Sequence, residues 1–397
     1  MAASHRILIA GAGLGGLTAA LSCLHQGMDV DVFEQAPDLK EVGAGVQISP
    51  TSLRVLIALG LEEQVMDACF NPVGRELRVW NTGYSAATPF KHADMIERYG
   101  LPNITMHRAD LHGILLNAVR ERKADAVHVS SRVEGFVDDG STITLRIEDG
   151  RTFAGDALIG ADGLHSRVRR QLFGASKPQF TGGIAWRGII PMEKLPESHR
   201  TLNGQNWLGT HGHFVVYPIR RGELVNIVGH IERDDWQVET WTQAGTHAEI
   251  AADFAGWHEH VQTLIENIEI PYKWAIFLHP TMEQWSIGRA TLLGDACHPT
   301  LPYLAAGANM AIEDAFVLAR CIDQYSEDIP LALKRYEELR IPRTTRIVDA
   351  SAANLNSYHH PDLGDPEKSR AYIDREAVKQ RDTRQWLYDY DATTVAV

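Results

Sequence analysis

A glycine-rich turn near the N-terminus has the spacing needed to bind a dinucleotide. An apolar run leads into Gly11-x-Gly13-x-x-Gly16, and the next apolar run, at 30–33, ends in Glu34. The first glycine allows a tight turn, the second lets a pyrophosphate approach the backbone, and the third lets helix pack on strand. The helix N-terminus offers free N–H groups to phosphates, and Glu34 can accept hydrogen bonds from ribose hydroxyls. The pattern predicts a site for FAD or NAD, although similar turns also occur without a ligand.

Two further motifs place an aspartate at the end of an apolar strand. They are Gly160-Ala161-Asp162-Gly163 and Gly294-Asp295-Ala296-Cys297-His298-Pro299. A carboxylate on such a strand-to-loop turn can accept a hydrogen bond from the ribityl chain of a flavin. The small residues at 302–310 can begin a helix, and its N-terminal dipole would stabilise negative charge on a reduced flavin ring. Gly294-Asp295 alone would be an ordinary turn, but the three motifs together favour a flavin enzyme.

His213 and Tyr217 lie four residues apart in an apolar run. If the run is a strand, both side chains lie on one face, because side chains alternate along a strand. A histidine or tyrosine within hydrogen-bond reach of a phenol can take its proton. The alternative is that both are half-buried residues of a sheet with no catalytic role.

Composition limits the classes of partner. The chain has 397 residues, of which 44% are hydrophobic and 22% charged, and its formal net charge is −13. This acidic balance argues against nucleic acid or an anionic membrane as a partner. No apolar run reaches the length of a membrane span, and the first strand begins too early for a signal peptide to precede it. A monomer or a homodimer is expected.

Cysteine and histidine usage predicts a reducing compartment and no metal. The four cysteines show no C-x-x-C spacing, which is typical of reduced thiols in a cytoplasmic protein. His298 follows Cys297, but no further ligand-type residues stand near it at metal spacing. His359 and His360 fall in a polar linker and are predicted to be exposed to solvent.

The motifs imply an α/β fold interrupted by an antiparallel sheet. We predict a Rossmann-like FAD-binding domain, an inserted antiparallel-sheet substrate domain and C-terminal helices. The first part of the FAD-binding domain is predicted at 1–177 and contains a small strand-rich excursion near 72–106. The substrate-binding sheet is predicted at 178–280 and the second part of the FAD-binding domain at 281–350. A C-terminal helix and tail are predicted at 351–397.

Local patterns predict the helices and hairpins of this fold. Apolar residues at helical spacing predict helices at 51–69, 107–120, 247–267, 307–325 and 331–357. Asp139-Gly140 and Asp149-Gly150 predict two hairpin turns. After the polar linker, a short tail rich in Trp386, Tyr388 and Tyr390 is expected.

At this point the chain resembles the class A, single-component flavoprotein aromatic hydroxylases. The glycine motif at 11–16, the segment 160–169 and the motif at 294–299 carry the resemblance, which covers nearly the whole chain up to about residue 350. Within that family it looks most like the salicylate, 3-hydroxybenzoate and 6-hydroxynicotinate hydroxylases. The resemblance implies a FAD-binding domain of the glutathione-reductase type, with NADH or NADPH and O2 as cosubstrates.

The resemblance also implies a set of residues that contact FAD. These are Gly11, Gly13, Leu14, Gly15, Gly16, Glu34, Gln35, Gln47, Arg108, Val133, Asp162, Asp295, Gly307, Ala308 and Asn309. For Arg108, which opens a predicted helix, the alternative is a surface arginine without a ligand. A simple NAD-dependent dehydrogenase is disfavoured, because the chain has one G-x-G-x-x-G and the family uses it for FAD.

The implied chemistry is oxygen insertion into an electron-rich ring by way of a flavin C4a-hydroperoxide. The protein must then hold the ring, exclude water and remove a phenolic proton. By resemblance, His213 and Tyr217 are catalytic residues that also bind substrate, and Pro302 and Tyr303 line the other wall of the pocket.

Departures from the family bear on the substrate. The 3-hydroxybenzoate enzymes have glutamine where this chain has Pro302, and the 6-hydroxynicotinate enzymes have histidines at the positions of Gln47 and Tyr303. We therefore expect the substrate to be a small hydroxybenzoate, with salicylate slightly ahead of 3-hydroxybenzoate and 6-hydroxynicotinate. Salicylate would be hydroxylated with loss of its carboxylate, which gives catechol. Two alternatives remain: a hydroxylase of a larger phenolic metabolite, and a flavin-fold protein that binds a metabolite without turnover.

Overall fold

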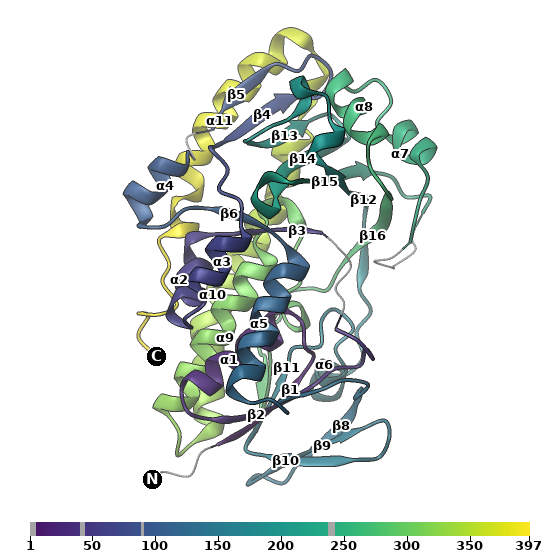
Figure 1. Ribbon diagram of the computed structural model, residues 1–397. Coiled ribbons are helices and arrows are strands. Elements are labelled where there is room, and N and C mark those ends of the chain that lie inside the picture. Colours follow the sequence, from purple (N-terminus) through teal and green to yellow (C-terminus); the bar gives the residue numbers. More distant parts are fainter. Residues whose placement is uncertain (1–4, 40–43, 89–90, 237–242) are drawn as a thin grey trace.

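A parallel sheet forms the base of the molecule (Figure 1). The computed structural model describes residues 5–39, 44–88, 91–236 and 243–397. The six-stranded sheet has the order β17 (Ser286–Ile287), β18 (Ala290–Leu292), β11 (Ala157–Gly160), β1 (Arg6–Ala10), β2 (Asp29–Phe33) and β7 (Val127–His128). All neighbours pair in parallel except β17, which is an antiparallel edge. β1 and β11 are almost continuously apolar and buried, because helices cover both faces of a parallel sheet.

Helices from distant parts of the chain pack around this sheet. They are α1 (Leu14–His25), α2 (Pro50–Ala58), α3 (Glu62–Ala68), α5 (Arg108–Arg122), α6 (Arg167–Phe173) and α9 (Gly307–Gln324). The predicted single helix over 51–69 is wrong: it is two helices, because Gly60 adopts a φ of +86° between them. The predicted helices at 107–120 and 307–325 are confirmed as α5 and α9.

Two small antiparallel sheets complete the lower half. One contains β8 (Val133–Asp138), β9 (Ile143–Ile147) and β10 (Thr152–Gly155), and the other contains β3 (Gly45–Ile48) and β6 (Ile104–His107). Both predicted hairpins are confirmed, since Asp139-Gly140 joins β8 to β9 and Asp149-Gly150 joins β9 to β10. β3 and β6 lie between the parallel sheet and the upper half of the molecule (Figure 1).

The upper half is a seven-stranded sheet. Its order is β16 (Tyr272–Leu278), β12 (Gln179–Pro191), β15 (Leu224–Glu232), β14 (Gly212–Ile219), β13 (Gly204–Leu208), β4 (Arg75–Val79) and β5 (Ser85–Ala87). Neighbours pair antiparallel except β4 with β13, which are parallel. The strand-rich excursion near 72–106 therefore supplies two edge strands to this sheet, and also α4 (His92–Tyr99).

The two faces of this sheet have different roles. Phe214 and Val216 of β14 belong to an apolar core shared with α7 (His247–Asp253) and α8 (Glu259–Glu266), which confirm the helical spacing at 247–267. His213, Val215 and Tyr217 point to the other face, because side chains alternate along the strand. This second face is the one that borders the candidate site.

Short 3-10 segments connect these elements. They are η1 (Met192–Lys194), η2 (Glu197–His199), η3 (Arg220–Gly222), η4 (Gly294–Ala296), η5 (Pro302–Leu304) and η6 (Pro361–Gly364). η4 and η5 lie between β18 and α9, so they connect the parallel sheet to the second face of the upper sheet. All four cysteines are free and buried.

Two long helices end the chain, α10 (Ile329–Tyr358) and α11 (Pro366–Tyr388). The predicted short tail after residue 366 is wrong, because α11 is a helix of 23 residues that lies beside β4 and β5 (Figure 1). The sequence of α11 is strongly polar, and its buried stripe of Tyr372, Ile373 and Ala377 is narrow. Asp365 caps it by accepting hydrogen bonds from the backbone N–H of Glu367 at 2.9 Å and Lys368 at 3.1 Å. None of the helices in the described ranges is long and apolar enough to cross a membrane.

Candidate active site

The glycine turn after β1 forms an open cradle at the N-terminus of α1. Gly11 has a φ of +99°. A Cβ at Gly11 would clash with the backbone oxygen of Ala161, and a Cβ at Gly16 would clash with the backbone oxygen of Gly11. These two glycines are therefore needed for the close approach of the turn, α1 and the loop after β11. A Cβ at Gly13 would meet nothing within 4 Å, and Gly13 gives α1 no side-chain cap. The first N–H groups of α1 are thus available to phosphate oxygens.

Neighbouring residues of the motif have packing roles. Leu14 is buried, and a Cβ at Gly15 would lie 2.7 Å from the Leu293 side chain and 3.2 Å from Cβ of Ala311. Gly15 thus lets α1 pack against α9. Side-chain contact of Leu14 with a cofactor is not favoured by this burial, so any contact there would come from the backbone.

Glu34 lies at the edge of the cradle. Its two carboxylate oxygens accept hydrogen bonds from the backbone N–H of Ala12 at 2.9 Å and Ala36 at 2.8 Å. These bonds fix the carboxylate beside the glycine turn, and its further lone pairs can accept from ribose hydroxyls. Gln35, which is exposed, accepts a hydrogen bond from Nε of Arg132 at 2.8 Å.

Asp295 and the N-terminus of α9 form a second polar wall. The Asp295 side chain is exposed and makes no hydrogen bond or ion pair with any described residue. A Cβ at Gly307 would lie 3.9 Å from Oδ1 of Asp295, so the carboxylate is next to the start of α9. The N-cap of α9, Ala306, has no side chain that could satisfy the first-turn N–H groups of Gly307, Ala308 and Asn309. A free carboxylate beside free N–H groups matches a flavin, which offers ribityl hydroxyls and pyrimidine oxygens.

The Asn309 side chain is occupied within the protein. Its Nδ2 donates to the backbone oxygens of Gln47 at 2.9 Å and Ala305 at 2.8 Å, and its Oδ1 accepts from the N–H of Ser49 at 2.9 Å. Asn309 therefore ties β3 to α9. Contact with a cofactor would come from its backbone N–H.

Asp162 is also occupied. Its carboxylate accepts hydrogen bonds from the N–H of Arg167 at 2.7 Å and Val168 at 3.2 Å and from the Ser166 hydroxyl, so it caps α6. Burial raises the pKa of this carboxyl above its usual value. Arg167 in turn donates to the backbone oxygen of Val133, which is buried. Asp162 and Val133 thus hold the loop after β11 in place beside the cradle.

Arg108 stands at the first position of α5. Its backbone N–H donates to the carbonyl of Ala44 at 2.8 Å, which joins the start of α5 to the strand that carries Gln47. The Arg108 side chain is half-buried.

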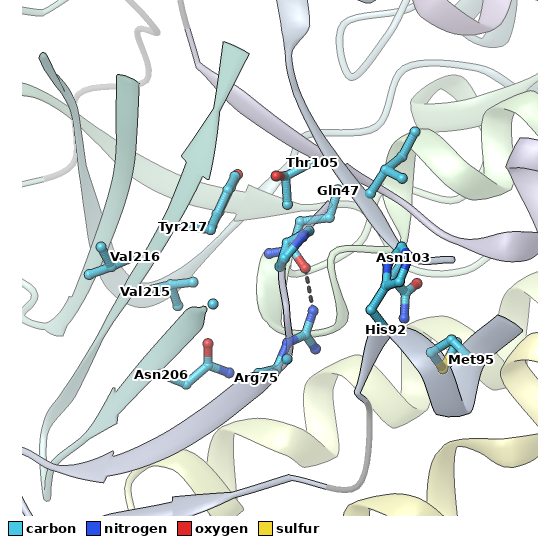
Figure 2. Close-up of a pocket in the computed structure, with 14 residues that line it drawn as sticks. Gln47, Arg75, His92, Met95, Asn103, Thr105, Asn206, Val215, Val216 and Tyr217 are labelled. Carbon is cyan, nitrogen blue, oxygen red and sulfur yellow. Dashed lines mark hydrogen bonds between the residues drawn. The ribbon is translucent and has the colours of Figure 1, made fainter. Parts of the chain in front are cut away.

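A cavity opens between the second face of the upper sheet and the strand pair β3 and β6. As Figure 2 shows, it has Tyr217 and Val215 on the sheet side and Asn103, His92 and Met95 opposite. A second cavity shares Gln47, Arg75 and Asn103 with it and reaches Ala305, Ala306 and Asn309. The two together connect the face of the sheet to the N-terminus of α9.

Arg75 is an unpaired cation in the wall of both cavities. Its Nη2 donates to Oε1 of Gln47 at 2.5 Å (Figure 2), and no carboxylate of the described chain forms an ion pair with it. The other arginine of β4, Arg78, instead pairs with Glu76 at 3.0 Å. An unneutralised guanidinium is a natural partner for an anionic ligand. Sequence reasoning missed Arg75, because a single basic residue on a short strand has no distinctive spacing.

Tyr217 and Gln47 both line this cavity, whereas the sequence assigns Tyr217 to the substrate and Gln47 to FAD. Tyr217 is 5% exposed, and burial raises the pKa of its hydroxyl although the charge of Arg75 lowers it. His213 lies on the same face of β14, but four residues span about 13 Å along a strand. Val215 separates the two side chains, so His213 lies beyond the end of the cavity.

His213 instead meets Tyr303 in a buried aromatic cluster. Its ring lies edge-on to Tyr303 at 5.0 Å and to Tyr358 at 5.0 Å, and it stacks on His230 at 5.1 Å. The Tyr303 hydroxyl is hydrogen-bonded to Nε2 of His230 at 2.8 Å. The residues that sequence reasoning placed opposite each other, His213 and Tyr303, are therefore in contact. Pro302, one residue earlier, is exposed at the start of η5.

The cluster is linked to the cavity and to the C-terminal helices. Nδ2 of Asn206, which lines the cavity, donates to the Tyr358 hydroxyl at 3.1 Å. His359 is hydrogen-bonded to His213 at 2.9 Å and is 9% exposed, so the prediction that it is solvated is wrong. The chain after α10 turns back onto the sheet, which buries this part of the expected linker. His360, by contrast, is half-exposed and stacks on Tyr372.

Three ring nitrogens, from His213, His230 and His359, lie within 4.8 Å of one another. This is a spacing at which a metal ion could be considered, whereas the sequence predicts none. The nitrogens of His213 and His359 are hydrogen-bonded to each other, and that of His230 to Tyr303. The arrangement is that of a hydrogen-bonded network.

Comparison with known proteins identifies the family. The family model described as an FAD binding domain matches residues 4–351. The chain belongs to the FAD-dependent aromatic hydroxylases. This hydroxylase is 37% identical over 98% of its length, and 97% of the relative's, to a 3-amino-4-hydroxybenzoate 2-monooxygenase of Streptomyces platensis. It is 32% identical to a 3-hydroxybenzoate 6-hydroxylase of Polaromonas naphthalenivorans, with 96% and 94% of the two chains covered.

Solved structures agree with this assignment. A salicylate hydroxylase in complex with substrate has a TM-score of 0.82 and 25% identity, and the match covers 99% of this chain and 97% of that one. The predicted fold class, the FAD cofactor and the monooxygenase class are thereby confirmed. The alternative of a flavin-fold protein without turnover loses its support, since the relatives are named as enzymes.

Proposed function

We propose that the hydroxylase acts on a small benzoate that carries a phenolic hydroxyl, with NADH or NADPH and O2 as cosubstrates. The observation that carries the proposal is Arg75, which forms no ion pair with the described residues and lines a cavity that continues to the N-terminus of α9. A carboxylate would neutralise it. The net charge of −13 makes such a local cation necessary for an anionic substrate.

The residues present fit FAD. The open turn at Gly13 and the N-terminus of α1 would hold the pyrophosphate, Glu34 the adenosine ribose, Asp295 the ribityl chain, and the first N–H groups of α9 the pyrimidine ring. When bound there, FAD supplies the reduction and activation of dioxygen. The chain's own residues orient the aromatic ring, exclude water and receive the phenolic proton.

We assign proton removal to His213, and this assignment requires the substrate ring to extend past Val215 to the His213 end of the second face. Burial, with the neighbouring histidines, lowers the pKa of His213 well below the ordinary value, so it is neutral at neutral pH and able to accept a proton. Tyr217 has a raised pKa and keeps its proton, which suits a hydrogen-bond donor to the substrate. Pro302 and Tyr303 would bound the ring on the side of η5.

The substrate to test first is 3-amino-4-hydroxybenzoate, which the relative of 37% identity is named for. Salicylate, which the sequence placed slightly ahead, and 3-hydroxybenzoate and 6-hydroxynicotinate are the other members of the panel. A hydroxylase of a larger phenolic metabolite stays the alternative. A cytoplasmic location and a monomeric or homodimeric state stay predictions from composition.

The experiment uses purified yellow protein with NADH and then NADPH. Oxygen uptake and product identity are measured with each member of the panel. Stimulated consumption with a ring-hydroxylated product supports the proposal, and catechol from salicylate would show loss of the carboxylate. Stimulation only by a phenol without a carboxylate would contradict it.

Asp295→Ala should weaken FAD binding by about 10- to 100-fold, since a hydrogen bond to a charged group contributes roughly 1.5–3 kcal/mol. FAD affinity is measured by flavin fluorescence during dilution or titration. Asp323→Ala, which removes another exposed carboxylate from the far end of α9, is the matched control and should bind FAD normally. An Asp295→Ala protein that retains FAD like the parent would remove Asp295 from the cofactor site.

A further inference from the structure

The second cavity has an apolar wall to which the upper sheet contributes no residue. Five residues of η5, α9, α10 and α11 form this wall: Leu304, Met310, Ile347, Leu387 and Tyr388. All five belong to a small apolar cluster that is separate from the main core of the parallel-sheet half. The cluster also contains Met95 of α4, which lines the first cavity. Segments far apart in the sequence therefore meet at one boundary of the two cavities.

The wall lies along a different face of α9 from the one that packs on the glycine cradle. Ala306, Met310 and Glu313 line the second cavity and are spaced four and three residues apart, as on one face of a helix. Ala311 lies on another face, where its Cβ would be 3.2 Å from a Cβ at Gly15. The apolar part of the second cavity is therefore distinct from the surfaces that fit the pyrophosphate and ribityl chain of FAD.

The charges around the second cavity favour an anionic ligand at one point. Glu313 lines the cavity, but its carboxylate accepts hydrogen bonds from Arg340 at 2.8 Å and from Arg343 at 2.7 Å, so its charge is balanced. Arg75 lines both cavities and forms no ion pair with the described residues. A ligand carboxylate at Arg75 would therefore lie where the two cavities meet.

Contacts with arginines hold the end of α11 in place. Arg343 donates a hydrogen bond to the backbone carbonyl of Leu387 at 3.0 Å, and the same guanidinium bonds to Glu313 of α9. The guanidinium of Arg346 lies over the Trp386 ring, 3.8 Å from its centroid. Leu387 is 7% exposed and packed within the apolar cluster. These contacts make its side chain a fixed part of the cavity wall.

We propose that the second cavity is a subsite for a small apolar substituent beside the carboxylate of the substrate, and that Leu387 and Ile347 limit the size of that substituent. The proposal rests on the proposed function and deepens it, because it adds a size limit to the class of carboxylated phenols. With the carboxylate at Arg75 and the ring in the first cavity, a group on the adjacent ring carbon would point into the second cavity. A methyl group would contact the apolar wall, whereas a longer chain would overlap with Leu387.

The test compares three ligands that differ only in the group beside the carboxylate. They are 4-hydroxybenzoate, 4-hydroxy-2-methylbenzoate and 4-hydroxy-2-propylbenzoate. The Kd of each is measured with the FAD-loaded protein from flavin difference spectra, without turnover. In the parent, the methyl compound should bind at least as tightly as 4-hydroxybenzoate, because its methyl group leaves water. The propyl compound should bind about tenfold or more weakly, because it must displace packed side chains.

Two variants enlarge the subsite from different helices. Leu387→Ala and Ile347→Ala each remove apolar atoms from the wall and leave space that an apolar group can fill. In each variant we expect the ratio of the Kd of the propyl compound to that of 4-hydroxybenzoate to fall about tenfold or more. The ratio removes any general loss of affinity, and FAD content is measured alongside. Ile347→Ala decides the question if Leu387→Ala fails to retain FAD.

Val348→Ala is the matched control. Val348 follows Ile347 in α10 and belongs to the same apolar cluster, but it lies outside both cavities of the described chain. Its Kd ratio should equal that of the parent. Parental ratios in both Leu387→Ala and Ile347→Ala would overturn the subsite. A fall in Val348→Ala as large as in Leu387→Ala would also overturn it, since loosening of the cluster would then explain the effect.

Failure of the subsite and failure of the proposed function give different results. If the parent binds and hydroxylates a carboxylated phenol but the wall variants keep its Kd ratio, only the subsite is wrong. If the parent neither binds the three ligands nor turns over any carboxylated phenol, the proposed function is wrong and the subsite falls with it.

Discussion

Replacing His213 with alanine should lower the rate of hydroxylation by about 100-fold or more while FAD stays bound. His213 lies in the upper sheet and outside the glycine cradle, so the cofactor contacts are not disturbed. Without the base, the bound substrate stays a neutral phenol and its ring carbon is a weaker nucleophile. NADH would then be consumed without hydroxylation, so product formed per NADH should fall as well.

The pH dependence gives this prediction a specific signature. In the parent, the lowered pKa of His213 keeps it neutral, so activity from this group is lost only as the pH falls through that low value. In His213→Ala the phenol must ionise unaided, so the rate should rise with pH toward the value at which the free phenol ionises, about 10 for an unsubstituted ring. The measurement is product formation and NADH consumption between pH 6 and pH 10.

His260, in α8, provides the control for loss of a buried histidine that packs against the same sheet. It is also buried, and it stacks on Trp207 on the opposite face. His260→Ala should keep the product yield of the parent and its pH profile, even where it lowers the unfolding temperature. If His213→Ala formed product per NADH as the parent does at neutral pH, His213 could not be the base.

Short-range signals were sufficient to predict the nucleotide-binding part of the fold. Gly16 is required by its close contact with Gly11 within the turn, and Gly11 by its positive φ, so local backbone geometry explains much of the motif. The same holds for the hairpins at Asp139-Gly140 and Asp149-Gly150. Tyr217, assigned by resemblance to the substrate, and Gln47, assigned to FAD, line one cavity in the structure.

Long-range contacts were not predictable in this way. His230 and Glu232 lie on β15, and His359 lies at the end of α10, more than a hundred residues away in sequence. No periodicity joins them, and a histidine in a polar segment is usually exposed. α11 was missed for a related reason, since its few apolar residues gain their burial only from β4 and β5, which come from the other end of the chain.

Arg75→Met should weaken binding of carboxylated substrates by about 10- to 100-fold, since a hydrogen bond to a charged group contributes roughly 1.5–3 kcal/mol. Methionine keeps most of the side-chain volume but removes the positive charge that no described carboxylate neutralises. The loss should appear in KM and in the Kd from flavin difference spectra. Binding of the corresponding phenol without a carboxylate should be unchanged, and Arg75→Lys should recover part of the difference.

Arg78→Met is the matched control, because Arg78 pairs with Glu76 and lies over Trp207, which faces away from the cavity. If Arg75→Met and the parent showed the same ratio of affinity for the carboxylated phenol to affinity for the phenol without a carboxylate, Arg75 would not bind the carboxylate. The substrate class would then have to be argued from the His213 end of the site alone.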